Sequence, residues 1–378
     1  MKILTLNKIA ACGLAQFPAS YTSGDDIATP DAILVRSASM HDMPLDPATV
    51  AIARAGAGTN NIPIDACTQA GVCVFNTPGA NANAVKELVI AGLFLSSRKV
   101  YDALSWCQSL KGKGDEVGTL VEKGKGAFGG PEIAGKTLGL IGLGAIGSLT
   151  ANAAAALGMR VIGCDPYINE EVRASLDASV QLVDTWDDVL AQSDYISLNV
   201  PLTAQTKGAF NAEAFAKAKD GLRLLNFARA ALVNDTDLIA ALQSGKVAAY
   251  VTDFPTDEVI GVPGVTAIPH LGASTPESED NCAVMAAQQI TAYLETGAVK
   301  NSVNLPATSV AASFSHRVCV VHSAEVKTAV LEKIGAAEQL TSNVRGEVAY
   351  TVADTVAAVD AAALQEIPSV LRVRALVS

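Results

Sequence analysis

The sequence has few aromatic and few charged residues, and it lacks the segments that mark several classes of protein. Aromatic side chains make up 5% of the 378 residues and charged side chains 17%, while half of the residues are apolar. A composition of this kind excludes disorder as the dominant state. No run of about eighteen consecutive apolar residues occurs, so we expect no membrane span. The N-terminus shows no long apolar segment and no signal cleavage site, which predicts a cytoplasmic protein.

Cysteines and basic residues are also too few or too scattered to indicate a disulfide framework, a metal site or a nucleic-acid-binding surface. The seven cysteines form no C-x-x-C pair, and their number is odd. We therefore expect reduced thiols, with no disulfide framework and no metal site. The formal net charge is −11, and no basic run exceeds a few residues. This argues against a nucleic acid or an anionic membrane as partner, whereas a small anionic substrate would need local arginines.

What the sequence does contain is a regular alternation of short apolar runs with amphipathic stretches. This alternation predicts βα units and parallel sheets, and the length suggests two or three domains. We expect a long helix from about Ala82 to about Leu110, followed over 111–135 by a loop with an arm toward a partner subunit. Thr185-x-x-Asp188 predicts the start of a further helix.

A glycine-rich turn is the most specific motif. The segment 140–147 reads Leu-Ile-Gly-Leu-Gly-Ala-Ile-Gly, which is G-x-G-x-x-G between a predicted strand and a predicted helix. Gly142 permits the tight turn, Gly144 lets the backbone approach a pyrophosphate, and Gly147 allows close packing of helix and strand. The helix N-terminus supplies N–H groups to the phosphates, with Ala145 and Ile146 in its first turn.

An acidic residue completes the nucleotide motif. Asp165 ends the next predicted strand, 18 residues after Gly147, where a carboxylate accepts hydrogen bonds from ribose hydroxyls. Because this carboxylate would repel a 2′-phosphate, NAD is favoured over NADP. S-adenosylmethionine is the alternative ligand, but it leaves the motifs that follow unexplained.

Three side chains at the ends of later predicted strands suit the reduction of a keto acid. Arg229 can hold the carboxylate and polarise the carbonyl. His270 can deliver the proton, and Glu258 can orient the imidazole and keep it protonated. Taken singly, such residues more often have ordinary roles: an arginine like Arg229 forms a surface ion pair, a histidine like His270 stands in a turn, and a glutamate like Glu258 is a solvated loop acid.

Together these segments resemble the D-isomer-specific 2-hydroxyacid dehydrogenase family over nearly the whole chain. The matching motifs are Asn226-x-x-Arg229, Asp253-x-x-x-x-Glu258 and Pro269-His270-x-Gly272-Ala273-Ser274-Thr275. The resemblance implies an NAD-dependent dehydrogenase with Arg229, Glu258 and His270 as catalytic residues. It also implies cofactor contacts from a set of residues at the strand ends, namely Gly142, Gly144, Ala145, Ile146, Gly147, Asp165, Pro201, Thr206, Phe227, Ala228, Asp253, Gly272 and Ala273.

The first eighty residues resemble the substrate lobe of the subfamily that oxidises 3-phosphoglycerate. The implied substrate-binding residues are Arg36, Ser37, Arg54, Ala55, Gly56, Ala57, Gly58 and Asn76. The backbone around 55–58 would meet the substrate carboxylate, and Arg36, Ser37 and Arg54 could gather about the phosphate. Alternatively, the two arginines hold the lobe together through ion pairs.

The tail after about residue 316 resembles an ACT regulatory domain. Ser323-Ala324-Glu325-Val326-Lys327 replaces the Asn-x-Pro-Gly turn of serine-regulated relatives, so we expect weak or no inhibition by serine. The substitution of Ala230 for the usual glycine after the arginine should matter little.

The expected fold is α/β. It has two doubly wound parallel-sheet lobes, a Rossmann-type cofactor lobe and a discontinuous flavodoxin-like substrate lobe, plus a small α+β ACT-like domain. We expect substrate binding by 1–84 and 276–306, NAD binding by 85–275, and the ACT-like domain over 316–378. The resemblance further implies a homo-oligomer, a dimer or a tetramer. Two alternatives stay open: a dehydrogenase for another acid such as glycerate or lactate, and an NAD-sensing interaction protein like the C-terminal-binding corepressors.

Overall fold

The computed structural model describes residues 1–377, which form two compact units. The first unit comprises residues 1–81 and the chain from Pro276 onward, and the second comprises residues 82–275. None of the helices within residues 1–377 is both long enough and apolar enough to cross a bilayer.

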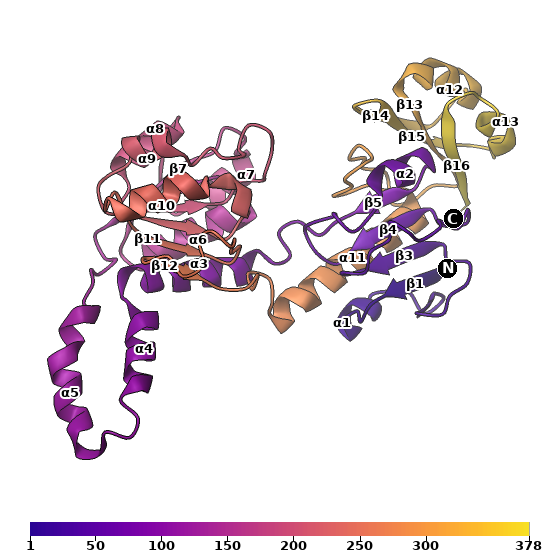
Figure 1. Ribbon diagram of the computed structural model, residues 1–378. Coiled ribbons are helices and arrows are strands. Elements are labelled where there is room, and N and C mark those ends of the chain that lie inside the picture. The colour runs from indigo at the N-terminus through magenta and orange to yellow at the C-terminus, as the bar shows by residue number, and fades with distance from the viewer. Residues whose placement is uncertain (378) are drawn as a thin grey trace. The chain divides into compact units, whose positions relative to one another are not determined.

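A seven-stranded parallel sheet forms the middle of the second unit (Figure 1). Its strands are β6 (Thr137–Ile141), β7 (Arg160–Cys164), β8 (Gln181–Leu182), β9 (Tyr195–Leu198), β10 (Leu222–Asn226), β11 (Val247–Thr252) and β12 (Val265–Ala267). They lie in the order β12-β11-β10-β9-β6-β7-β8. This is the doubly wound order of dinucleotide-binding sheets with one strand added. The order in which successive strands are added reverses between β6 and β9, while all strands stay parallel. The expected α/β fold is confirmed.

Helices cover both faces of this sheet, which explains why its strands are apolar on both sides. The helices are α3 (Ala82–Ser97), α6 (Ala145–Ala156), α7 (Glu170–Ser175), α8 (Trp186–Gln192), α9 (Ala212–Lys217) and α10 (Asp235–Gln243). One core contains Leu93 of α3 and Ala151 of α6, and another contains Phe215 of α9 and Leu238 of α10. Thr185 caps α8 as predicted, because its Oγ1 accepts a hydrogen bond of 3.1 Å from the Asp188 N–H.

The segment between α3 and β6 differs from the expectation. The expected single helix over about 82–110 is two helices, since α3 ends at Ser97 and α4 (Val100–Ser109) starts after a break. The expected loop over 111–135 contains η1 (Gly114–Glu116), α5 (Val117–Gly124) and η2 (Lys125–Phe128). The described residues of α4 and α5 include no buried side chain, and both helices extend away from the sheet (Figure 1). The many glycines of 111–135 favour a loop, so the short apolar period of α5, with Val117, Leu120 and Val121 on one face, does not by itself predict a helix.

The first unit contains a five-stranded parallel sheet in the order β2-β1-β3-β4-β5, the flavodoxin-like order. Its strands are β1 (Lys2–Leu6), β2 (Thr22–Gly24), β3 (Ala32–Val35), β4 (Ala51–Arg54) and β5 (Cys73–Phe75), and its helices are α1 (Ala11–Leu14), α2 (Ile64–Gln69) and α11 (Pro276–Thr296). After α11 the chain returns to this sheet. Buried Asn304 accepts a hydrogen bond from the Val74 N–H and donates one to the Val72 carbonyl, both 2.8 Å long.

The tail forms a separate antiparallel sheet in the order β14-β15-β13-β16. Its elements are β13 (His316–Ser323), η4 (Ala324–Val326), α12 (Lys327–Ile334), β14 (Gln339–Arg345), β15 (Val348–Thr355), α13 (Ala361–Gln365) and β16 (Val370–Val377). Cys319 and Tyr350 share one hydrophobic core with Phe75 and Tyr293 of the parallel-sheet part. The tail therefore packs against the parallel-sheet part of the same unit, in addition to a second core formed by tail residues such as Val320, Val330 and Leu364. Its ACT-like character stays a prediction.

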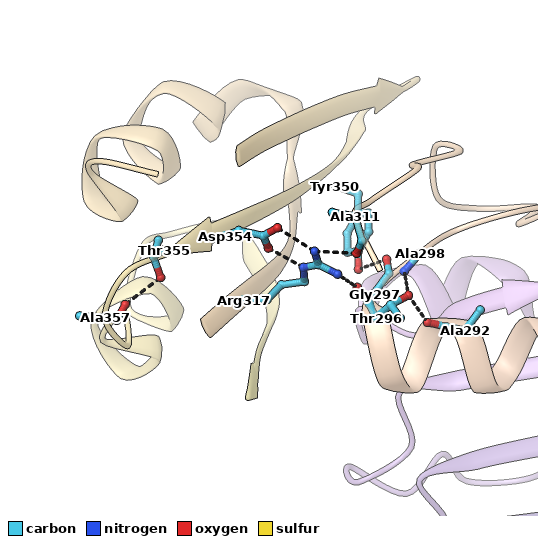
Figure 2. Close-up of polar contacts among 10 residues, drawn as sticks. All are labelled: Ala292, Thr296, Gly297, Ala298, Ala311, Arg317, Tyr350, Asp354, Thr355 and Ala357. Carbon is cyan, nitrogen blue, oxygen red and sulfur yellow. Dashed lines mark hydrogen bonds and ion pairs between the residues drawn. The ribbon is translucent and has the colours of Figure 1, made fainter. Parts of the chain in front are cut away.

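A buried ion pair anchors the tail to the end of α11 (Figure 2). Two guanidinium nitrogens of Arg317 donate to the Asp354 carboxylate at 2.5 and 2.7 Å, and the Arg317 side chain is fully buried. The same guanidinium donates to the carbonyls of Thr296 and Ala311 at 2.7 and 2.9 Å. The fork geometry of arginine thus satisfies acceptors from three segments at once.

We expect Asp354→Ala to lower the free energy of unfolding by about 3–5 kcal/mol, because Arg317 would keep a buried charge without its carboxylate. Asp220→Ala is the control, since Asp220 pairs with Lys246 at 2.9 Å while 91% exposed, and such pairs contribute about 0–1 kcal/mol. Urea unfolding followed by circular dichroism measures both. Equal stability of the two variants would show that the buried pair does not anchor the tail.

Candidate functional site

The glycine-rich turn after β6 forms an open cradle at the start of α6. Gly142 has φ of +93°, a left-handed conformation that favours glycine. A Cβ at Gly147 would lie 2.1 Å from the Gly142 carbonyl oxygen, whereas a Cβ at Gly144 would meet nothing within 4 Å. Gly144 is the N-cap of α6 and provides no side-chain cap. The N–H groups of the first turn, at Ala145 and Ile146, therefore face a space that phosphate groups can enter.

Asp165 links this cradle to the end of β7. Its carboxylate accepts hydrogen bonds from the N–H groups of Leu143 at 2.8 Å and of Tyr167 at 2.9 Å. The half-buried side chain thus lies directly beside the glycine turn, as the motif predicts for the residue that binds ribose.

The loop after β9 contains the predicted cofactor residues Pro201 and Thr206. Thr206 donates from its hydroxyl to the Pro201 carbonyl at 2.7 Å and accepts from the Thr203 N–H at 2.8 Å. These bonds close the loop into a compact turn without any help from a regular element.

A buried asparagine shapes the loop that carries Arg229. Asn226, at the end of β10, is fully buried, and its Oδ1 accepts from the N–H groups of Ala228 and Arg229 at 3.2 and 3.3 Å. Its Nδ2 donates to the Arg229 carbonyl at 2.9 Å. The Phe227 ring instead belongs to the core beneath α3 and is 7% exposed, so only its backbone remains for the predicted cofactor contact.

Asp253 follows β11 and is also fully buried. One carboxylate oxygen accepts from the Gly272 N–H at 2.9 Å, which ties β11 to the turn that contains Gly272 and Ala273. The other oxygen has no hydrogen-bond partner among the described residues. Burial raises the pKa of this carboxyl, against the Gly272 hydrogen bond and the charge of His270, which both lower it.

An aromatic ring joins two of the three predicted catalytic residues. The ring centroids of Phe254 and His270 are 4.4 Å apart, and the Arg229 guanidinium carbon lies 5.6 Å from the centroid of Phe254. His270 and Arg229 are themselves exposed. Sequence reasoning assigned no role to Phe254, although it stands inside the Asp253–Glu258 segment.

Glu258 is not joined to the other two. It is exposed in the turn after β11, and no hydrogen bond or ion pair within residues 1–377 connects it to His270. Its role in orienting the imidazole stays a prediction. The same described residues contain no group of three or more His, Cys, Asp or Glu side chains that could hold a metal ion.

In the first unit, the predicted substrate residues follow the carboxyl ends of β3, β4 and β5. Arg36 and Ser37 come directly after β3, and the Asn7 side chain accepts from the Ser37 N–H at 2.9 Å. Nε of Arg54, at the end of β4, donates to the Arg36 carbonyl at 3.0 Å. The two arginine residues are therefore neighbours.

The loop over 55–58 lies beside Arg54. Ala57 accepts from the Asn76 side chain at 2.6 Å, and a Cβ at Gly58 would lie 2.6 Å from a guanidinium nitrogen of Arg54. Within residues 1–377, the N–H groups of Ala57 and Gly58 donate to no other residue. This loop therefore presents free donors next to a cation, as an anion-binding loop requires.

Three features of the second unit indicate that a dinucleotide can bind there. An uncapped helix start, an open space at Gly144 and a buried Asp253 oxygen without a partner each leave polar capacity that a ligand can use. The residues present therefore fit the group, and all of them lie at the carboxyl edge of one sheet.

Comparison with known proteins agrees with a dinucleotide-binding second unit. Residues 91–272 match the family model described as D-isomer specific 2-hydroxyacid dehydrogenase, NAD binding domain. The chain is 36% identical over 292 residues to D-3-phosphoglycerate dehydrogenase of Bacillus subtilis, covering 75% of this chain and 53% of that protein. It is 38% identical over 249 residues to hydroxypyruvate reductase of Thermotoga maritima, covering 63% of this chain and 76% of that protein.

A solved structure of 3-phosphoglycerate dehydrogenase from Entamoeba histolytica with NAD+ is 27% identical, with a TM-score of 0.61. The match covers 80% of this chain and 98% of that one. The chain spans about half the length of the D-3-phosphoglycerate dehydrogenase from Bacillus subtilis.

Gly147→Ala and Gly144→Ala should separate the structural role of the cradle from its binding role. A methyl group at Gly147 meets the backbone, so we expect a loss of about 1–3 kcal/mol in stability. At Gly144 the methyl group finds room, so stability should stay within about 0.5 kcal/mol, while NADH affinity falls about tenfold or more. Thermal unfolding and NADH fluorescence titration check this. Unchanged NADH affinity of Gly144→Ala would place the cofactor elsewhere.

Proposed function

Because the chain belongs to the D-isomer-specific 2-hydroxyacid dehydrogenase family, we propose that it oxidises 3-phosphoglycerate to 3-phosphohydroxypyruvate with NAD, the first step of phosphorylated serine biosynthesis. One observation carries the chemical part of this proposal: Phe254 brings an imidazole and a guanidinium together, at 4.4 and 5.6 Å from its ring. This pair lies on the unit that contains the dinucleotide cradle. An acid–base group and a cation are what the oxidation of a 2-hydroxy acid requires.

In the proposed mechanism His270 takes the proton of the C2 hydroxyl group as the carbonyl forms, and returns it in the reverse direction. NAD, when bound, accepts the hydride that leaves C2. Arg229 holds the substrate carboxylate and stabilises negative charge on the C2 oxygen. Glu258 is proposed to orient the imidazole.

The residues of the first unit support a phosphorylated substrate. Arg36 and Arg54 are neighbours in a protein of net charge −11, beside the free N–H groups of Ala57 and Gly58. In the proposal the loop receives the carboxylate, and the two arginines receive the phosphate. The substrate-binding domain is then 1–84 with 276–306, and the NAD-binding domain is 85–275.

A second candidate is a reductase for hydroxypyruvate or a similar unphosphorylated acid. The relative from Thermotoga maritima, of which this chain covers 76%, carries such a name. Both candidates share the chemistry at C2, and they differ in whether the substrate needs a second anionic group.

His270→Ala should lower kcat by about 10²–10⁴-fold, the usual contribution of a general acid–base group. NADH affinity should change little, because the predicted contacts to the dinucleotide come from other residues. Steady-state kinetics and NADH titration measure the two effects. His316→Ala, at the start of β13, is the control. A wild-type rate for His270→Ala would remove the histidine from the mechanism.

The wild-type enzyme should favour 3-phosphoglycerate over glycerate by at least about a hundredfold in kcat/KM, because two charge-assisted contacts contribute about 1.5–3 kcal/mol each. Arg54→Ala should abolish most of that preference and leave NADH binding intact. Arg98→Ala, an exposed arginine in the second unit, serves as the control. Equal efficiency with glycerate or lactate would favour the second candidate and contradict the phosphoglycerate assignment.

A further inference from the structure

Arg36, one of the two arginines proposed to bind the substrate phosphate, forms an ion pair with a carboxylate of the protein. Nη2 of Arg36, directly after β3, contacts Oε1 of Glu279 in the first turn of α11. The two side chains are 43% and 41% exposed, so water reaches both. No other carboxylate among residues 1–377 forms an ion pair with Arg36.

The start of α11 faces both arginines. Cys282 lies one turn beyond Glu279 on this helix, and burial raises the pKa of its thiol while the charges of Arg36 and Arg54 lower it. The Arg54 side chain in turn donates to the Arg36 carbonyl at 3.0 Å. Glu279 is therefore a negative charge placed beside the cationic side chain of Arg36, with Arg54 close to Arg36.

An anionic group that binds Arg36 has to exchange with Glu279 or bind beside it. Release of Glu279 costs little, because a half-exposed ion pair contributes only modestly and a carboxylate in the first turn is stabilised by the helix dipole. A carboxylate that stays nearby repels a doubly charged phosphate more strongly than it affects a neutral hydroxymethyl group.

We infer that Glu279 is a specificity-determining residue, which competes with the anionic substituent of the substrate for Arg36 and thereby limits affinity for the phosphorylated acid. This inference rests on the proposed function. Glu279 holds Arg36 when no anion is bound, and it sets the selectivity between phosphorylated and unphosphorylated acids below the value that the arginines alone would give.

The test compares Glu279→Gln with Glu277→Gln, an exposed glutamate of the same helical turn. For Glu279→Gln we expect KM for 3-phosphoglycerate to fall about two- to fivefold, the size appropriate to a half-exposed ion pair. We expect unchanged kcat, unchanged NADH affinity and unchanged kcat/KM for glycerate. Glu277→Gln should behave like the wild type. A purely structural role would instead change kcat or both substrates together.

An unchanged or higher KM for 3-phosphoglycerate in Glu279→Gln would overturn the inference. The Glu279 carboxylate would then have no effect on substrate binding, or it would help binding by positioning Arg36. Failure of the proposed function gives a different result, namely a wild-type enzyme without preference for the phosphorylated acid. In that case inorganic phosphate is the probe. A larger rise in melting temperature with phosphate for Glu279→Gln than for wild type supports competition at Arg36, and an equal rise refutes it.

Discussion

Parallel pairing of strands is the constraint on which both candidate sites depend. In a parallel sheet every carboxyl end lies at the same edge, so residues far apart in the chain meet there. The turn at Gly142, Asp165 and Asp253 converge on one edge because β6, β7 and β11 run in the same direction. The first unit applies the same rule to Arg36 and Arg54 after β3 and β4. Where the order of strands reverses, no crossover helix covers that edge, and it remains accessible to a ligand.

One local device recurs at these strand ends. Asn7, Asp165, Asn226 and Asp253 each stand at or just after the last residue of a strand, and each accepts a hydrogen bond from a backbone N–H of a neighbouring loop. Short Asx side chains are suited to this task because they reach the backbone without spanning a second element. The loops thus obtain a fixed shape although they lack regular secondary structure. At Asn226 and Asp253, which are fully buried, an amide or carboxylate without these hydrogen bonds would be costly.

Charge is distributed unevenly in relation to these sites. The chain carries a net charge of −11, yet the first unit contains a fully buried arginine, Arg317, paired with Asp354. The nearly half-exposed Arg36 pairs with Glu279 instead. The buried pair holds one arrangement because breaking it leaves an unpaired charge in a low-dielectric interior. The exposed pair can exchange partners because water solvates both groups. An ion pair therefore serves as an anchor in the tail and as an exchangeable contact near the loop over 55–58.

The sequence by itself determined those features that depend on neighbours along the chain. The βα alternation, the Gly142–Gly147 turn and the cap at Thr185 are local, because backbone conformation and capping involve residues within a few positions of each other. The helices within 111–135 escaped prediction because the many glycines of that segment favour a loop. The break after Ser97 escaped it because apolar residues continue on both sides of the break. Only the tertiary structure placed the Phe254 ring beside both Arg229 and His270 and paired Arg36 with Glu279. It also joined the tail to the core of the five-stranded sheet. These contacts join side chains from separate elements, and no local pattern encodes which distant side chains will meet, because close packing of the whole chain decides it.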